Sequence, residues 1–370
     1  KEIAEESMVL LKNDGILPLK AGEQKIAFIG KFAEKPRFQG GGSSHINSFK
    51  VESALDAVKA YTEVAYAQGY DVKEDKIDEA MVKEAVETAK NADVAVIFAG
   101  LPDAFESEGY DREHMGMPDC QNYLIQEILK VQKSVVVVLH NGSPVEMPWA
   151  DRVAAIVHGY LGGQAGASAM LDVLTGATCP SGKLNETYAY SLEDVASTSY
   201  YPAIERSSEY REGLYMGYRY FDTAGVKVRF PFGFGLSYTT FDYSDLTVDG
   251  GGVPFTITNT GECDGSEIAQ MYVGHERSHL FGPKKELKGF VKVFLKKGES
   301  QQVTIPFDDK TFRYYNVKTN GWEVEGGAYQ IYIGASVEDI RLRAEIEKES
   351  SGAPLPYDMK CLPSYENGQV

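Results

Sequence analysis

Uninterrupted runs of apolar residues constrain the fold of this chain more than any other feature. Residues 94–99, 135–139 and 154–158 are such runs, the last of them ending in a histidine; each is too short for a membrane span, and they are typical of strands buried on both faces of a sheet. Apolar residues at helical spacing occupy segments between and around them: 2–12, 55–61, 80–91, 121–131 and 165–174. This alternation predicts an α/β sandwich with a mostly parallel sheet over residues 1–240.

The pattern changes after Tyr238. Short strand-like segments separated by turn residues follow at 255–259, 268–273, 290–295, 302–307 and 329–333. Several strands at this spacing predict an antiparallel β-sandwich, which we assign to residues 241–345. Residues 346–370 contain prolines and few large aliphatic side chains, so we expect an extended tail or linker there.

A cluster of charged residues follows the apolar run at 94–99. Residues 106–112 include Glu106, Glu108, Asp111 and Arg112, with Gly109 allowing a tight backbone among them. Ligands of open α/β sheets bind beyond the carboxyl ends of the parallel strands. The charged residues therefore stand where such a protein carries its chemistry, although a solvated loop without function is the alternative.

This loop resembles the acid/base loop of glycoside hydrolase family 3, in its β-glucosidase type. Further segments are similar to blocks of the same family and occur in the same order: 4–13, 40–44, 141–146, 180–184, 215–222 and 232–239. Together the similar segments cover residues 1 to about 345. The resemblance implies an α/β sandwich followed by a fibronectin-type-III-like domain, in agreement with the two patterns above.

The family cleaves glycosidic bonds with retention, which requires two carboxyl groups roughly 5–5.5 Å apart. The resemblance implies an acid/base glutamate on the α/β sandwich and an aspartate nucleophile on a TIM barrel. The 370 residues leave no room for a barrel of roughly 250 residues beside the two domains already assigned. We therefore expect one half of the active site of a retaining β-glycosidase, foremost a β-glucosidase. The barrel would lie elsewhere in the same protein or in a companion chain.

The resemblance assigns the acid/base role to Glu108, which directly precedes Gly-Tyr-Asp-Arg, with Glu106 as the second candidate. Two neighbouring carboxylates raise the pKa of one of them, as a general acid near neutral pH requires. Glu106, Asp111 and Arg112 are expected to contact substrate. A structural ion pair between Asp111 and Arg112 is the alternative.

The glycine-serine loop at residues 40–44 supplies the second group of candidates. It follows the strand predicted at 25–29, so it lies at the same edge of the sheet as the charged loop. In the family a serine of this loop contacts a sugar hydroxyl, and both Ser43 and Ser44 qualify. The loop lacks the GxxxxGK[ST] and GxGxxG phosphate-binding patterns, and a flexible surface loop is the alternative reading.

Composition limits the partners. A net charge of −17 argues against nucleic acids and anionic membranes, and no apolar run reaches transmembrane length. The histidines show no paired ligand spacing, and the cysteines, at 120, 179, 263 and 361, form no CxxC pair, so neither a metal nor another cofactor is predicted. The expected partner is a β-linked oligosaccharide or glucoside. Homo-oligomerisation stays open, and the cysteine pattern favours the cytoplasm without excluding secretion.

Two classes of function remain. The first is the acid/base half of a retaining β-glycosidase. The second is a carbohydrate-binding or scaffold fragment without catalysis. An unrelated α/β hydrolase would need a G-x-S-x-G nucleophile elbow, which the sequence lacks.

Overall fold

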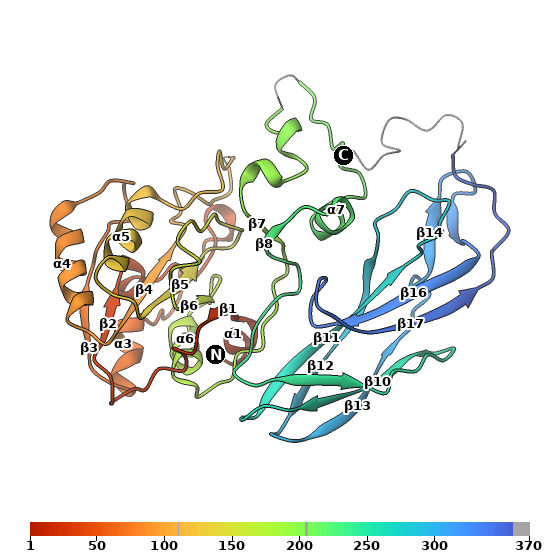
Figure 1. The fold of residues 1–370 in the computed structure, drawn as a ribbon. Helices are drawn as coiled ribbons and strands as arrows, with labels where there is room; N and C mark the ends of the chain where they lie inside the picture. Colours follow the sequence, from red (N-terminus) through yellow and green to blue (C-terminus); the bar gives the residue numbers. More distant parts are fainter. Residues whose placement is uncertain (110, 204–205, 358–370) are drawn as a thin grey trace. The chain divides into compact units, whose positions relative to one another are not determined.

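The computed structural model describes residues 1–109, 111–203 and 206–357 (Figure 1). These residues pack as two compact units. The α/β unit comprises Lys1–Lys183 and Gly235–Tyr238, and the β unit comprises Leu184–Phe234 and the chain from Thr239 onward. Packing thus groups residues 184–234 with the β-rich half, whereas the sequence pattern placed them in the α/β domain. A folding boundary near residue 240 stays a prediction.

The α/β unit is built on a six-stranded sheet in the order β1-β6-β5-β4-β2-β3. The strands β2 to β6 are parallel, and β1 pairs antiparallel with β6 at one edge. Their bounds are β1 (Val9–Asn13), β2 (Ile26–Ile29), β3 (Val64–Ala67), β4 (Val94–Gly100), β5 (Val135–His140) and β6 (Ala155–His158). Every residue of β4 is buried, as the continuous apolar run predicts. The prediction of a mostly parallel sheet is confirmed.

The strand order reverses between β2 and β4. The chain runs outward from β2 to the edge strand β3, then returns to β4 on the other side of β2 and continues to β5 and β6. The loops that leave the carboxyl ends of β2 and β4 diverge at this point, because their crossover connections cover opposite faces of the sheet. A reversal of this kind is where open parallel sheets bind their ligands.

Helices cover both faces of the sheet. α4 packs against α5, while α1 and α3 pack against α6, and Figure 1 shows α4 and α5 on the opposite side of the sheet from α1 and α6. Asp78 caps α4, and α6 ends at Gly176 in the left-handed conformation. The helices are α1 (Glu2–Ser7), α2 (Lys31–Glu34), α3 (Ala54–Ala57), α4 (Glu79–Lys90), α5 (Asp119–Leu129) and α6 (Gly166–Thr175).

The helix predicted over residues 2–12 is wrong in its second half. α1 ends at Ser7, and β1 begins at Val9. Residues 8–11 are four consecutive buried apolar residues, and β1 uses them to pair with β6. The free edge of the sheet offers this segment backbone partners and burial on both faces, which outweighs the helical spacing of its apolar residues.

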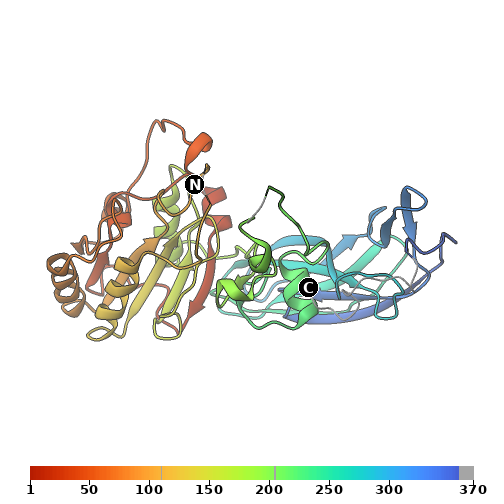
Figure 2. The same cartoon turned by 90° about the horizontal axis from the view of Figure 1, so that it is seen from above.

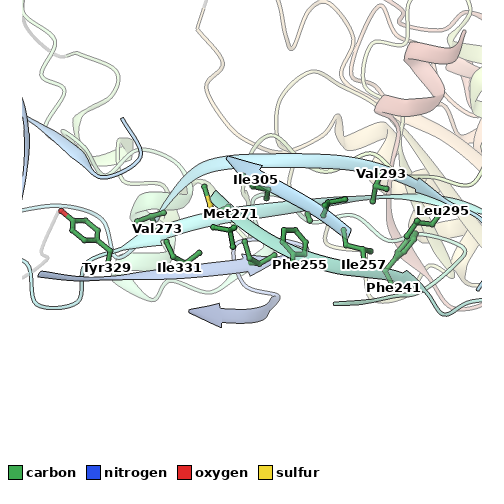
Figure 3. Close-up of a cluster of buried hydrophobic side chains, with 14 residues drawn as sticks. Phe241, Phe255, Ile257, Met271, Val273, Val293, Leu295, Ile305, Tyr329 and Ile331 are labelled. Atoms are coloured by element: carbon green, nitrogen blue, oxygen red, sulfur yellow. The ribbon is translucent and has the colours of Figure 1, made fainter. Parts of the chain in front are cut away.

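The β unit contains an antiparallel sandwich (Figures 1 and 2). One sheet has the order β13-β10-β9 and the other β12-β11-β16-β17. Side chains from both sheets form the core, and Figure 3 shows Phe255, Met271 and Ile331 among them. The strands are β9 (Phe241–Ser244), β10 (Gly252–Asn259), β11 (Gly265–Gly274), β12 (Glu286–Leu295), β13 (Ser300–Pro306), β16 (Gly327–Gly334) and β17 (Ile340–Lys348). The predicted β-sandwich is confirmed.

The last strand departs from the prediction. β17 continues to Lys348, three residues into the segment expected to be an extended tail, and its Ile346 pairs with Tyr329 of β16. Apolar residues alternate with charged ones along this strand, so that one face packs on the core. A hairpin that the sequence pattern missed, β14 (Arg313–Asn316) with β15 (Gly321–Val324), completes the unit.

The segment between Leu184 and Phe234 is largely irregular. It carries the short pair β7 (Tyr188–Ala189) and β8 (Val228–Phe230) and the helix α7 (Tyr218–Ala224). The block at 215–222 has a structural role, because its side chains dock α7 onto the start of β12. Tyr218 accepts a hydrogen bond from the amide of Leu287, and Asp222 forms a 2.6 Å ion pair with Lys285.

Candidate active site

Three loops meet at the carboxyl edge of the sheet. They follow β2, β4 and β5, which are neighbours in the order β5-β4-β2. The loop after β2 carries Arg37 and the glycine-serine segment, the loop after β4 carries Glu106 and Glu108, and the loop after β5 carries Gly142 and Ser143. Parallel strands end at a common edge, so residues far apart in the chain come together here.

The carboxylate of Glu106 is held on all sides. Arg37 Nη1 donates to Glu106 Oε2 at 2.6 Å, and the Gly142 amide donates to the same oxygen at 2.9 Å. The Ser143 hydroxyl donates to Oε1. The Glu106 side chain is 20% exposed and that of Arg37 only 4%. Since both carboxylate oxygens accept hydrogen bonds from protein groups, Glu106 is suited to anchor the loop rather than to exchange protons with a substrate.

Arg37 also holds the backbone of this loop. Its Nη1 donates to the carbonyl oxygen of Leu101 at 2.7 Å, and its Nη2 donates to that of Glu106 at 2.5 Å. Its Nε lies 3.2 Å from a carboxylate oxygen of Asp103. One buried guanidinium therefore ties the segment after β2 to both ends of the turn after β4.

Glu108, two residues after Glu106, is exposed and differently placed. Its Oε2 accepts a 2.5 Å hydrogen bond from the backbone amide of Ser43. The hydroxyl and the amide of Ser43 hold the pKa of the Glu108 carboxyl below its ordinary value. The carboxylate is thus fixed by one neighbouring loop and otherwise open to solvent.

The expectation that a neighbouring acid raises the pKa of Glu108 is wrong for this chain. The negative charge of Glu106 lies beside the positive charge of Arg37, so it does not act on Glu108 as a lone like charge. Glu108 is also exposed, so no desolvation outweighs its hydrogen bonds to Ser43.

Glycines allow the two loops to touch. Gly42 has φ +78°, and a Cβ at this position would lie 2.8 Å from Glu108 Oε2 and closer still to Glu108 Cβ. A Cβ on Gly41 would meet the side chain of Ser107. Residues 42–44 form one turn of 3₁₀ helix pressed against the loop after β4, so the glycine-serine segment is a docked element and not a free surface loop.

The two serines of this segment differ. Ser43 presents its amide to Glu108, whereas the hydroxyl of Ser44 donates to the carbonyl oxygen of Gly41 within its own turn, at 3.1 Å. Ser43 is therefore the serine beside the candidate acid/base.

Arg112 anchors the second part of the charged loop. Its Nη1 donates to the Ser143 hydroxyl at 3.0 Å and to the Pro144 carbonyl oxygen at 2.8 Å, and its Nη2 donates to that of Met115 at 2.9 Å. Asp111 is exposed, and the Asp111–Arg112 ion pair stays a prediction. Tyr110, between these residues and Glu108, lies outside the described residues.

The sequence analysis missed Arg37 and Ser143. Arg37 stands between Pro36 and Phe38 in the loop after β2. An arginine between apolar residues is buried only when it has a partner, and this position could have marked Arg37 as a paired cation. Ser143 stood inside a block that reads as a strand-end turn, and no local pattern marks it as a ligand of Glu106 and Arg112.

Other titratable groups of the α/β unit do not join the site. His140 and His158 are enclosed at the ends of β5 and β6, and burial lowers their pKa values to about 4 and about 3, so both are neutral. No group of three or more His, Cys, Asp or Glu side chains suited to a metal ion occurs in the part of the chain that the structure describes. Cys120, Cys179 and Cys263 are not in disulfides, and Cys361 lies outside that part. Nor does any described helix combine the length and apolar character needed to span a bilayer.

Comparison with known families gives two matches, one within the residues predicted to form the α/β domain and one within those predicted to form the β-sandwich. The family described as "Glycosyl hydrolase family 3 C-terminal domain" matches residues 8–238. The family described as "Fibronectin type III-like domain" matches residues 267–337.

Individual relatives are longer than this chain. It is 47% identical to thermostable beta-glucosidase B of Acetivibrio thermocellus, over 95% of this chain and 48% of that protein. It is 44% identical to an exo-alpha-(1->6)-L-arabinopyranosidase of Bifidobacterium breve, over 96% of this chain and 49% of that protein. The crystal structure of the GH3 beta-glucosidase of Bifidobacterium adolescentis superposes with a TM-score of 0.91 at 44% identity, covering 97% of this chain and 54% of that one. The chain spans about half the length of the curated relatives it matches.

Proposed function

Because the chain belongs to glycoside hydrolase family 3, we propose that it supplies the acid/base half of the active site of a retaining β-glycosidase, with Glu108 as the catalytic carboxyl group. The favoured substrate is a β-glucoside, in line with the names of several relatives. The aspartate nucleophile would belong to a barrel domain carried by the rest of the protein or by a companion chain.

One observation carries the choice of Glu108. Of the two glutamates on the loop, Glu106 has both carboxylate oxygens engaged by Arg37, Gly142 and Ser143, while Glu108 is exposed and accepts a hydrogen bond from Ser43. A general acid must reach the glycosidic oxygen with its own proton. Glu108 can do so, whereas Glu106 would first have to give up an ion pair with a buried guanidinium.

Exposed apolar side chains at the same edge support a covering domain. The segment that follows the glycine-serine loop exposes Ile46, Val51 and the whole side chain of Phe49. Gln39 fixes the start of this segment, because its side-chain amide both accepts from Ile46 N at 3.0 Å and donates to the Ile46 carbonyl oxygen at 3.1 Å. This anchored loop exposes apolar side chains to solvent next to Glu108, which is one of the two carboxyl groups that the reaction needs. Such a surface fits one that the barrel covers.

The lowered pKa of Glu108 in this chain fits such an arrangement. A docked barrel would bury the Glu108 carboxylate and bring the anionic nucleophile to roughly 5–5.5 Å, and both effects raise the pKa of Glu108 so that it holds a proton. Glu108 then protonates the leaving oxygen while the nucleophile attacks the anomeric carbon.

Once the glycosyl ester has formed, the nucleophile no longer carries its charge. The pKa of Glu108 falls again, and the hydrogen bonds from Ser43 favour its carboxylate form. In that form Glu108 removes a proton from the water that hydrolyses the ester. Ser43 thus supports the base form of the same residue that acts as the acid in the first step.

The test is Glu108→Ala in the complete protein. Turnover of glucosides with poor leaving groups should fall by roughly 100–10,000-fold, while dinitrophenyl glucosides should lose less in the first step because their leaving group departs without protonation. Azide, which attacks without a base, should restore turnover of the activated substrate and yield a β-glucosyl azide.

Glu106→Gln is the matched variant two residues away, and azide should not accelerate it. The non-catalytic alternative, a carbohydrate-binding or scaffold role, predicts near-normal rates and no azide effect in the Glu108 variant. That result would remove Glu108 from the chemistry.

A further inference from the structure

Arg37 is a buried cation with several partners at the sheet edge. Its guanidinium contacts the Glu106 carboxylate, the carbonyl oxygens of Leu101 and Glu106, and the carboxylate of Asp103. It stands on the loop after β2, 69 residues before the glutamate that it binds. The Arg37 side chain is shielded from solvent, and of its two carboxylate partners Glu106 is 20% exposed and Asp103 is 65% exposed.

We propose that Arg37 is a positioning residue for Glu108: it fixes the loop after β4 at the distance that Ser43 requires, and it compensates the charge of Glu106. The proposal rests on the proposed role of Glu108. It adds a residue that touches neither substrate nor reacting atoms and that acts through the loop carrying the acid/base.

The positional part follows from where Arg37 binds. Leu101 begins the turn after β4, and Glu106 ends it, where its amide donates to the Pro102 carbonyl oxygen at 3.2 Å. Arg37 binds both ends and belongs to the same loop as Ser43, so it fixes the separation between the backbone of Ser43 and that of Glu108. The Ser43–Glu108 hydrogen bond of 2.5 Å depends on that separation.

Only arginine can hold this arrangement. Two nitrogens of one planar group donate to a carboxylate oxygen, to the carbonyl oxygen of the same residue and to a second carbonyl oxygen. A lysine ammonium in the same place keeps the positive charge but lacks the planar pair of NH2 groups that donate in two directions. Arg37→Lys therefore keeps the positive charge but removes the hydrogen bonds that position the loop, so the two effects can be measured separately.

The charge part follows from the groups around Glu108. The charged and titratable side chains on the two loops near these residues include Arg37, His45, Asp103, Glu106, Asp111, Arg112, Glu113 and His114, of which His45, Glu113 and His114 are exposed. Asp103 and Asp111 are exposed, so solvent and salt screen them, whereas Arg37 and Glu106 form a shielded pair whose charges cancel. Removal of Arg37 leaves the negative charge of Glu106, which stands two residues from Glu108, and removal of Glu106 leaves the positive charge of Arg37 with the exposed Asp103 beside it.

Removal of Arg37 and removal of Glu106 leave charges of opposite sign near Glu108, so the two variants should shift its pKa in opposite directions. In the complete protein, the basic limb of the pH profile of kcat reports loss of the proton from the general acid. Arg37→Gln leaves the anionic Glu106 uncompensated and should move this limb up by roughly one unit. Glu106→Gln leaves Arg37 facing only the exposed carboxylate of Asp103, and it should move the limb down by a smaller amount. The double variant should return the limb close to its original position.

Arg37→Lys should leave the basic limb in place while lowering kcat for poor leaving groups by roughly 10- to 100-fold, because the loop loses its register but not its charge balance. Arg152→Gln removes an exposed cation from the same unit and is the control, with no change in either quantity. Circular dichroism on each variant separates these effects from loss of folding.

The inference fails if the two charge variants move the limb in the same direction or leave it unmoved, or if the double variant does not restore it. If Arg37→Gln does not fold, the other two variants still test the proposal. Glu106→Gln then tests the effect of charge on the basic limb, and Arg37→Lys tests the effect of loop position on kcat. If azide rescues Glu108→Ala but the basic limb of the pH profile does not move in the Arg37 and Glu106 variants, the role of Arg37 is overturned and that of Glu108 stands. Near-normal rates in Glu108→Ala overturn both.

Discussion

The backbone amide of Ser43 donates a 2.5 Å hydrogen bond to Oε2 of Glu108, which lies 65 residues further along the chain. This contact joins the loops that leave β2 and β4, where the strand order of the sheet reverses. It also sets the state of the carboxyl group, because Ser43 lowers its pKa. The acid/base candidate is therefore preorganised in its carboxylate form before any substrate or second domain is present.

The first prediction concerns the Ser43 hydroxyl. Ser43→Ala removes one of the two groups that lower the pKa of Glu108, so that pKa should rise toward its ordinary value in the 370-residue chain. A pH titration of the side-chain carboxyl resonances by NMR measures it. Ser44→Ala is the control, since the Ser44 hydroxyl binds Gly41 instead. An equal rise in both variants would contradict the assignment of Ser43.

The second prediction concerns the close approach at Gly42. Gly42→Ala places a Cβ against Glu108 and forces an L-residue into a positive φ, so the two loops must separate. In the complete protein kcat for a poor leaving group should fall by roughly 10- to 100-fold. Gly15→Ala is the matched control, because Gly15 has a positive φ but open space around it. Both variants should lose about 1–2 kcal/mol of unfolding free energy, and only Gly42→Ala should lose catalysis. Equal kinetic losses would show that backbone strain alone explains the effect.

The third prediction concerns acid stability. Burial lowers the pKa of His158 to about 3, below the ordinary value near 6.5, so the unfolded chain binds protons more readily than the folded one. This contribution to stability is complete above about pH 6.5 and decreases as the pH falls toward the folded pKa. Denaturant unfolding between pH 7 and 4 should therefore show a smaller loss of stability in His158→Gln than in the original chain. His114→Gln, at an exposed position, should retain the original pH dependence.

The fourth prediction concerns the ion pair that docks α7 in the β unit. Lys285 and Asp222 are 7% and 11% exposed and lie 2.6 Å apart. Lys285→Met leaves a buried carboxylate without its partner and should lower the unfolding free energy by about 3–5 kcal/mol. The double variant Lys285→Met with Asp222→Leu should recover most of the loss. Lys59→Met, which breaks an exposed pair with Asp56, should change stability by less than about 1 kcal/mol. Similar losses for both lysine variants would mean that burial is not what makes the first pair matter.

Much of the fold could be predicted because the strands have distinctive local patterns. The continuous apolar runs of β4 and β5 require burial on both faces, and the alternation along the later strands requires one buried face. The first strand escaped prediction because Val9–Asn13 carries a pattern that suits either a helix or a strand. Only the free edge of β6 decides between them.

The candidate residues of the site could be found in the same way, since the charged loop and the glycine-serine segment both follow predicted strands. Their individual roles could not. Glu106 and Glu108 are alike in type and stand two residues apart, and what distinguishes them comes from distant parts of the chain: Arg37 is 69 residues from Glu106, and Ser143 is 37.

The sequence by itself therefore determined the two kinds of domain, the edge of the sheet where the candidate residues lie, and the residue types available there. The tertiary structure alone decided which glutamate is held in a shielded ion pair and which stays open, and that Ser43 lowers the pKa of Glu108 where a raised one was expected. The physical reason is that hydrogen bonding, charge compensation and burial depend on neighbours in space. At this edge those neighbours come from three different strands, which only the folded sheet brings together.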